Sequence, residues 1–168
     1  MIRIFLLTLF FLGCQYQAPK PYAALALHYP AAQYNDFKPN ACSYRFKYNV
    51  VSTPVQLSSC GTTLDYSLLK AKVYVTYFDL SKTSLDTLFM DFENRLKIFG
   101  KGTQRINEST YEDKEKDVLG SCVTLIGNSP SNLHFFATDT KRHFISGSLL
   151  FSAAPNYDSL APAIGYIR

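Results

Sequence analysis

The chain has 168 residues, of which 47% are hydrophobic and 18% are charged, and its formal net charge at pH 7 is +4. This length suits one ordinary globular domain, and the absence of a block of basic residues argues against nucleic acid as a partner. The 12 Tyr and 13 Phe residues make up 15% of the chain, an aromatic content that favours half-buried strands.

The first 14 residues have the layout of a secretory signal. Arg3 is followed by an apolar run from Ile4 to Leu12 and by the pair Gly13-Cys14. A run of about nine residues is too short to cross the bilayer as a helix, which takes roughly 20 residues. We therefore predict that residues 1–13 are a signal peptide rather than a permanent membrane span.

The end of this segment, Phe11-Leu12-Gly13-Cys14, resembles the lipobox of bacterial lipoproteins, although Phe11 replaces the usual aliphatic residue. The resemblance implies that Cys14 is acylated, with palmitate as an expected chain, and becomes the first residue of the mature protein. The alternatives are an ordinary signal peptide that is cut nearby and an anchor that is not cut. Residues 14–27, rich in Pro and Ala, are predicted to be a lipid-anchored tether, followed by a single globular domain over 28–168.

Three further cysteines lie in the predicted domain, and their spacings match neither a CxxC redox pair nor a zinc site. In an oxidising periplasm we predict a disulfide between Cys42 and Cys60, because the two residues flank a hairpin-like stretch. Cys122 lies in an apolar run and is predicted to be a small buried core residue.

Strand patterns dominate the first half of the domain. The segment Ser43–Tyr48 alternates polar and aromatic residues, which places Tyr44, Phe46 and Tyr48 on one inward face. The segment around Val55–Leu57 is predicted to pair back onto it. Lys70–Phe78 is the strongest predicted strand, being rich in β-branched and aromatic residues.

The periodicity changes to that of an amphipathic helix after Thr83, which with Asp86 resembles a capping arrangement, and Gly100 is expected to end the helix. One apolar stripe predicts that this helix lies on a sheet: Leu85, Leu88, Phe89, Phe92, Leu96 and Phe99.

Four strands are then predicted over residues 104–110, 118–126, 132–138 and 144–152, with a charged turn over 111–117. The short connections require antiparallel neighbours. A closing helix is expected after Pro155, capped by Asp158 or Ser159, with Pro162 in its first turn. This order predicts an α+β fold, an antiparallel β-sheet flanked by helices, and is similar to the Mog1/PsbP-type α-β-α sandwich.

Residues suited to catalysis are scattered along the chain. His28, His134 and His143 lack the spacing of metal ligands, and there is no nucleophile elbow. We therefore expect no catalytic residues, no metal or other cofactor and no small-molecule substrate.

Several stretches resemble the GldD family of gliding-motility-associated lipoproteins, and the string P-N-Y-D-S-L-A-P is the most specific of them. The matching stretches are His28–Phe46, Lys72–Tyr77, His143–Phe151, Pro155–Pro162 and Tyr166–Arg168.

The resemblance implies a non-enzymatic accessory lipoprotein of the gliding machinery of Bacteroidetes that is needed also for type IX protein secretion. Its domain would lie in the periplasm, anchored to a membrane by Cys14, with other machinery proteins as partners. Asn156, Tyr157 and Asp158 are the candidate docking residues. The alternatives are a lipoprotein that binds cell-wall glycan through aromatic residues and, more weakly, a redox centre at Cys122.

Overall fold

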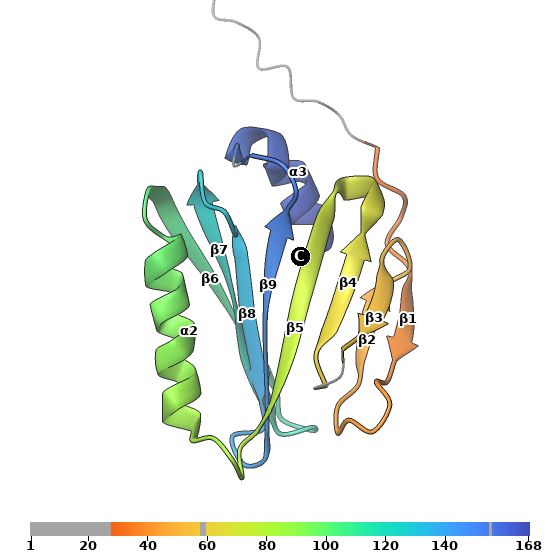
Figure 1. The fold of residues 1–168 in the computed structure, drawn as a ribbon, viewed down its shortest axis with the longest axis vertical. Coiled ribbons are helices and arrows are strands. Elements are labelled where there is room, and N and C mark those ends of the chain that lie inside the picture. Colours follow the sequence, from red (N-terminus) through yellow and green to blue (C-terminus); the bar gives the residue numbers. More distant parts are fainter. Residues whose placement is uncertain (1–27, 58–59, 155) are drawn as a thin grey trace, which may run out of the picture.

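The structure is a computed structural model that describes residues 28–57, 60–154 and 156–168. The predictions for the signal peptide, Cys14 and the tether lie outside these residues. The described residues form a seven-stranded sheet, a two-stranded sheet and helices (Figure 1). The elements are β1 (Tyr34–Phe37), β2 (Phe46–Asn49), β3 (Thr53–Gln56), β4 (Thr62–Tyr66), η2 (Ser67–Leu69), β5 (Ala71–Asp79), α2 (Leu85–Phe99), β6 (Thr103–Asp113), β7 (Val118–Gly127), β8 (Leu133–Thr138), β9 (His143–Phe151) and α3 (Tyr157–Ile167).

The large sheet is antiparallel throughout, with the strand order β3-β4-β5-β9-β8-β7-β6. The chain leaves β5 through α2, enters the far edge as β6 and returns through β7 and β8 to β9 (Figure 1). There β9 pairs with β5 over nine residue pairs, from Ala71↔Phe151 to Asp79↔His143. The predicted α+β class and antiparallel meander are confirmed, whereas the likeness to the Mog1/PsbP sandwich stays an analogy.

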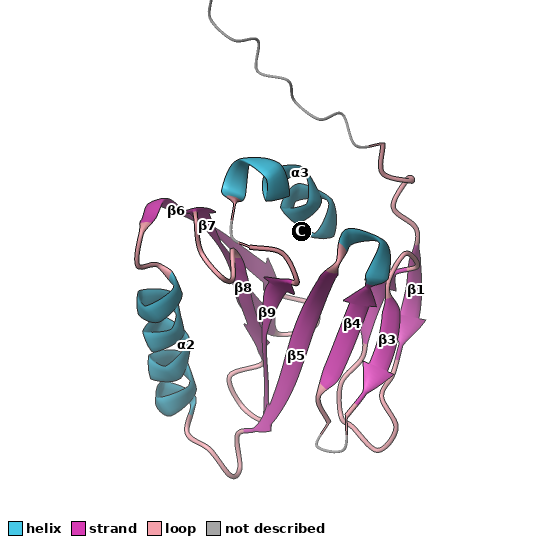
Figure 2. Cartoon of the chain, turned by 45° about the horizontal axis from the view of Figure 1, so that its top comes forward, coloured by secondary structure: helices cyan, strands magenta, loops and turns pink. Residues whose placement is uncertain are grey.

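Each face of the sheet carries its own apolar cluster, because successive side chains of a strand point to opposite faces. On one face, here called the α3 face, Val73, Leu133 and Leu149 pack with Ile164 of α3. On the other, the α2 face, Val123 and Leu125 pack with Phe92 of α2. The two helices thus lie against opposite faces of the sheet (Figure 2).

Helix α2 follows its predicted stripe, with Leu88 and Phe92 buried. Its N-cap, however, is Ser84 and not Thr83. The Ser84 hydroxyl accepts a hydrogen bond from the Thr87 N–H at 3.2 Å, which satisfies one of the free donors of the first turn. The helix ends at Gly100, as predicted. No helix within the described ranges is long and apolar enough to cross a membrane.

The first half of the domain differs from the prediction in its pairing. The segment containing Val55 forms β3 and pairs with β4, not with β2. Instead β2 pairs with β1 in a two-stranded ribbon. Neither β1 nor β4 was predicted, since four or five residues such as Thr62–Tyr66 carry too few apolar positions to establish a period.

Two boundaries in the second half also differ. Strand β6 runs to Asp113 because its last residues pair with Val118 and its neighbours, so the turn is shorter than predicted. Helix α3 is capped by Asn156 rather than by Asp158 or Ser159, and it begins where the Tyr157 N–H donates to the Asn128 side chain. This early start places Pro162 inside the helix instead of in its first turn.

The β1–β2 ribbon is fastened to the large sheet at one corner. A disulfide joins Cys42, before β2, to Cys60, before β4, with the two Cα atoms 5.7 Å apart. Beside it the Tyr44 hydroxyl donates to the Cys60 carbonyl oxygen at 2.7 Å and lies 2.9 Å from the Thr62 hydroxyl. The ribbon therefore cannot leave the sheet without breaking buried polar contacts as well as apolar ones.

The α2 face holds a buried histidine. His134 is 1% exposed, its Nε2–H donates to the Ser131 carbonyl, and its ring lies 5.2 Å from that of Phe99. Burial lowers the pKa of His134 to about 4, and the nearby Arg95 charge lowers it further against the opposing effect of the Ser131 bond. His134 is thus a neutral core residue, as the sequence allowed.

Replacing both Cys42 and Cys60 by Ala should lower the free energy of unfolding by about 3 kcal/mol, because the disulfide closes a loop of 18 residues in the unfolded chain. Urea unfolding of the variant beside Cys122→Ala, which keeps the disulfide, measures the difference. An unchanged midpoint, or an intact mass showing three alkylated thiols without prior reduction, would contradict the bond.

Acid should destabilise the protein through His134. The folded pKa lies below the unfolded value of 6.5, so the unfolded chain takes up the proton first as the pH falls. The contribution of His134 to the free energy of unfolding is fully present above pH 6.5. It is lost as the pH falls from 6.5 to 4, by on the order of 3 kcal/mol. The His134→Gln variant keeps an N–H donor but does not titrate, so its free energy of unfolding in urea should not show this decrease. An equal pH dependence in the wild type and the variant would contradict the role of His134.

Candidate functional site

The α3 face is covered only in part, and a cavity of about 670 Å³ opens in the remainder. It lies over β5, β9, β8 and β7, between the β1–β2 ribbon and the last residues of α3. In Figure 1 the β1–β2 ribbon lies beside β3 at the right, and α3 lies near the upper ends of β9 and β5. Cavities of about 300–1,000 Å³ are the usual size of small-molecule sites.

The floor of the cavity is apolar and owes its depth to small residues. Val75, Phe135 and Ile145 line it from three neighbouring strands, together with Ala137. The ring of Phe135 lies across Gly147, where a Cβ atom would come within 2.3 Å of the ring. Any larger residue at Gly147 would push the ring up into the cavity.

The ribbon forms one wall through the predicted aromatic alternation. Tyr44 is buried and Phe46 and Tyr48 are half-buried, so the prediction that these three face inward is confirmed. Tyr44 stacks on Tyr77 with ring centroids 5.4 Å apart. These rings are therefore used in packing the ribbon to the sheet.

The Tyr77 hydroxyl lies 2.7 Å from His143 Nδ1, at the end of the sheet where β9 begins. Burial raises the pKa of Tyr77, and the Asp79 charge raises it further. A neutral phenol next to an imidazole is a hydrogen-bonding pair. The Ser43 side chain also hydrogen-bonds Tyr77, which opposes this rise in its pKa.

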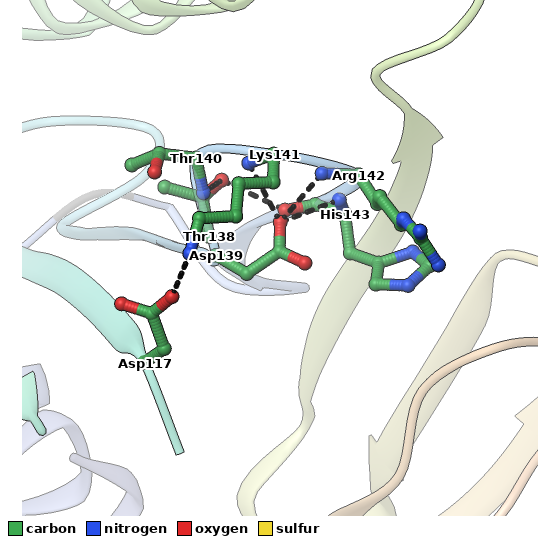
Figure 3. Close-up of polar contacts among 7 residues, drawn as sticks. All are labelled: Asp117, Thr138, Asp139, Thr140, Lys141, Arg142 and His143. Carbon is green, nitrogen blue, oxygen red and sulfur yellow. Dashed lines mark hydrogen bonds and ion pairs between the residues drawn. The ribbon is translucent and has the colours of Figure 1, made fainter. Parts of the chain in front are cut away.

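The turn that leads into His143 is ordered by Asp139 (Figure 3). One carboxylate oxygen of Asp139 accepts from the backbone N–H groups of Lys141, Arg142 and His143 at 3.1, 2.8 and 2.7 Å. Burial alone would raise the pKa of Asp139, but these three donors together bring it below its ordinary value. Lys141 also pairs with Asp117 across the neighbouring turn. Asp139 therefore acts as a turn-capping residue.

Charge around the cavity is predominantly basic. Of the five lining residues with a formal charge, only Asp139 is acidic. The four basic ones are Arg45, Lys47, Lys116 and Arg168.

Cys122 is half-buried and lines the cavity rather than the centre of the core. Burial raises its pKa, although the adjacent Arg168 guanidinium acts in the opposite direction. The thiol is thus held in its less reactive protonated form.

The predicted docking residues lie elsewhere, at the start of α3. Asn156 and Asp158 are exposed, whereas Tyr157 is half-buried and packs against the core of the α3 face. With Gly102, Gln104 and Asn128 they border a polar hollow of about 360 Å³. Three separate loops meet there, so the P-N-Y-D segment contributes both to packing and to an exposed surface.

The histidines are not gathered into one site. His134 lies on the α2 face and His143 on the α3 face, while His28 is an exposed residue before β1. No group of three or more His, Cys, Asp or Glu side chains that could hold a metal occurs within the described ranges. The sequence reasoning missed the cavity, for which the small residues Ala137 and Gly147 in otherwise bulky strands were the available signal.

The family model described as "Gliding motility lipoprotein GldD" matches residues 14–168. The match begins at Cys14, the residue that the lipobox-like sequence predicts to carry the lipid. Searches of curated proteins and of solved structures found no match.

Cys122 should be a poor nucleophile in the folded protein, since burial raises its pKa. We expect iodoacetamide at pH 7.5 to alkylate Cys122 more slowly in the native chain than in the chain unfolded in urea, as followed by intact mass. Cells that carry the Cys122→Ser variant should glide normally. Loss of gliding in cells whose Cys122→Ser protein is well folded would support the redox alternative.

Proposed function

We propose, since the chain belongs to the GldD family of gliding motility lipoproteins, that it is a membrane-anchored accessory protein of gliding motility and of the linked type IX protein secretion machinery. It acts through protein contacts that assemble or stabilise the machinery, and not by catalysis. The family match over residues 14–168 is the observation that carries this proposal.

The anchor is the lipid on Cys14, and we place the folded domain in the periplasm. The disulfide between Cys42 and Cys60 supports this compartment, because disulfides persist in oxidising environments. Near the first described residues, Tyr29 stacks on Tyr166 of α3 with ring centroids 4.7 Å apart. The chain from Cys14 therefore reaches the domain at α3, at a distance from the membrane limited by about 14 residues of up to ~3.5 Å each.

The polar hollow at the start of α3 is the surface that we assign to a protein partner. Asn156 and Asp158 are exposed there, and the Asp158 carboxylate forms no ion pair with another described residue. Asp158 also lies in the first turn of the helix, where a negative charge is favourable. An exposed charge on a rigid helix end suits recognition of a basic or hydrogen-bonding partner surface.

Glycan binding remains the alternative of a different class. The ribbon rings that would stack on sugars instead stack on one another, such as Tyr44 on Phe46 with centroids 6.0 Å apart. Sedimentation with purified cell wall separates the two functions, since only a glycan-binding protein should move with the wall in the absence of other machinery components.

Cys14→Ser should abolish gliding and type IX secretion without changing the thermal unfolding of the domain, because the substitution removes the anchor and no described contact. Gliding speed and the amount of secreted protein are the measurements, with protein level checked by immunoblot. A soluble periplasmic Cys14→Ser protein that supports normal gliding would contradict the anchored function.

Asp158→Lys should reduce crosslinking of the lipidated protein to its machinery partner in intact cells, measured by mass spectrometry after capture. The matched control is Asp86→Lys, because Asp86 is also exposed in the first turn of a helix and its reversal has the same helix-dipole cost of about 0.3–1 kcal/mol. Equal crosslinking of both variants would contradict a docking surface at the start of α3. Capture of no motility or secretion component would count against the proposed function itself.

A further inference from the structure

The cavity on the α3 face is an unassigned binding site, and its chemistry is that of an amphiphile site. Its floor consists of Val75, Phe135, Ala137 and Ile145, which offer no hydrogen-bonding side chains. The strands beneath are each paired on both sides, so their backbone groups are already satisfied. A peptide laid on this floor would leave its own N–H and C=O groups without partners, whereas a hydrocarbon chain would not.

The size and shape of the cavity suit one chain. Lining residues extend from Leu64 on β4 to Cys122 on β7, across four inter-strand spacings of about 4.8 Å each. At about 30 Å³ for each heavy atom, the share of a water molecule in the liquid, the 670 Å³ would hold roughly 20 heavy atoms. That is the size of a single long acyl chain with a small head group, and too small for a phospholipid with two such chains.

The charge at the cavity favours an anionic head group. Arg45 and Lys47 enter no ion pair within the described part of the chain, and Arg168 donates to the neutral Ser109 hydroxyl. The one acidic lining residue, Asp139, already accepts three backbone hydrogen bonds. The basic groups thus have unused capacity, while the acidic group has little.

Two of these cations approach one another from different elements. Lys116 lies in the turn between β6 and β7 and pairs with Asp113 at 2.7 Å, which raises the pKa of Lys116. Arg45, just before β2, is close enough for its charge to lower that pKa in turn. Both side chains line the cavity, where an anion would form charge-assisted hydrogen bonds with them.

We propose that the cavity of the α3 face binds a single-chain anionic amphiphile of the long-chain fatty acid class. The hydrocarbon chain lies on the floor formed by Val75, Phe135 and Ile145, and the carboxylate lies near Arg45 and Lys116. The β1–β2 ribbon shields the chain from water on one side and α3 on the other.

The test uses the lipidated full chain in phosphatidylcholine nanodiscs with a photoreactive palmitate that carries a diazirine near the end of its chain. After irradiation, crosslinked peptides are mapped by mass spectrometry. We expect labelling of the peptides that contain Phe135 and Ile145. Labelling confined to residues 14–27, or spread over exposed surfaces, would overturn the proposal.

Ala137→Phe should reduce this labelling by roughly tenfold, since a ring at that position fills the floor. The control is Ala32→Phe, which adds the same ring at an exposed position outside the cavity. Undiminished labelling in a folded Ala137→Phe protein would overturn the site.

A second pair of variants keeps the proposal testable should Ala137→Phe fail to fold. Reversing both Arg45 and Lys116 to Glu changes only exposed side chains and should reduce labelling roughly tenfold through the loss of charge-assisted bonds. Reversing Lys82 and Lys101 to Glu is the control, because both are exposed and neither lines the cavity. Equal labelling in the two double variants would overturn the head-group assignment.

Two further probes distinguish related ligands. Photoreactive hexadecanol, which lacks the carboxylate, should label the same peptides several-fold less; equal labelling would overturn the requirement for an anion. Photoreactive phosphatidylglycerol in the nanodisc should not label them, and labelling as strong as that by palmitate would overturn the single-chain assignment in favour of a membrane lipid.

Discussion

The attachment of the β1–β2 ribbon to the sheet is the constraint on which the shape of this domain depends. The ribbon has only four residue pairs of its own, too few for independent stability. The Cys42–Cys60 disulfide and the Tyr44 hydroxyl hold it at the start of β4. Because this corner is fixed, the inward rings of β2 form a wall over the α3 face. Without the ribbon, the same floor would be an open sheet surface.

The two faces of the sheet are used for different purposes. On the α2 face the helix lies directly over the sheet, and even polar groups are enclosed: Arg95 donates to the Ser146 hydroxyl at 2.6 Å and His134 is fully buried. On the α3 face Ala137 lines space that neither α3 nor the ribbon fills, while Gly147 lets the Phe135 ring lie close to the sheet. The α2 face therefore supplies rigidity, and the α3 face supplies a surface that can receive a ligand or partner.

The parts of the fold that could be predicted from sequence are those with a sustained period. The helix ending at Phe99 and strand β5 repeat their pattern over six or more residues, and both were found. The meander was found as well, although β6 is exposed over nearly its whole length and has only a weak strand pattern. Strands β1 and β4 are too short for such a pattern. The pairing of β3 with β4 rather than β2 is decided by contacts distant in sequence, and so was predicted wrongly.

The candidate sites show the same division. The Cys42–Cys60 bond was predicted correctly, although the hairpin from which it was inferred does not form, since β3 pairs with β4. The cavity was not, because it needs the ribbon, the end of α3 and five strands of the large sheet to be placed at once. Likewise Asp139 could be seen as a charged turn residue, while only the structure shows that its carboxylate is occupied by three N–H donors.

The family match and the fold describe a gliding motility lipoprotein in which a ribbon, held at one corner of the sheet, forms one wall of a cavity. Native mass spectrometry of the protein purified from its own membranes examines that cavity most directly. The account predicts one co-purifying single-chain anionic amphiphile per chain, present in the wild type and absent from a folded Ala137→Phe protein. An empty cavity in the wild type, or the same bound mass in both proteins, would contradict it.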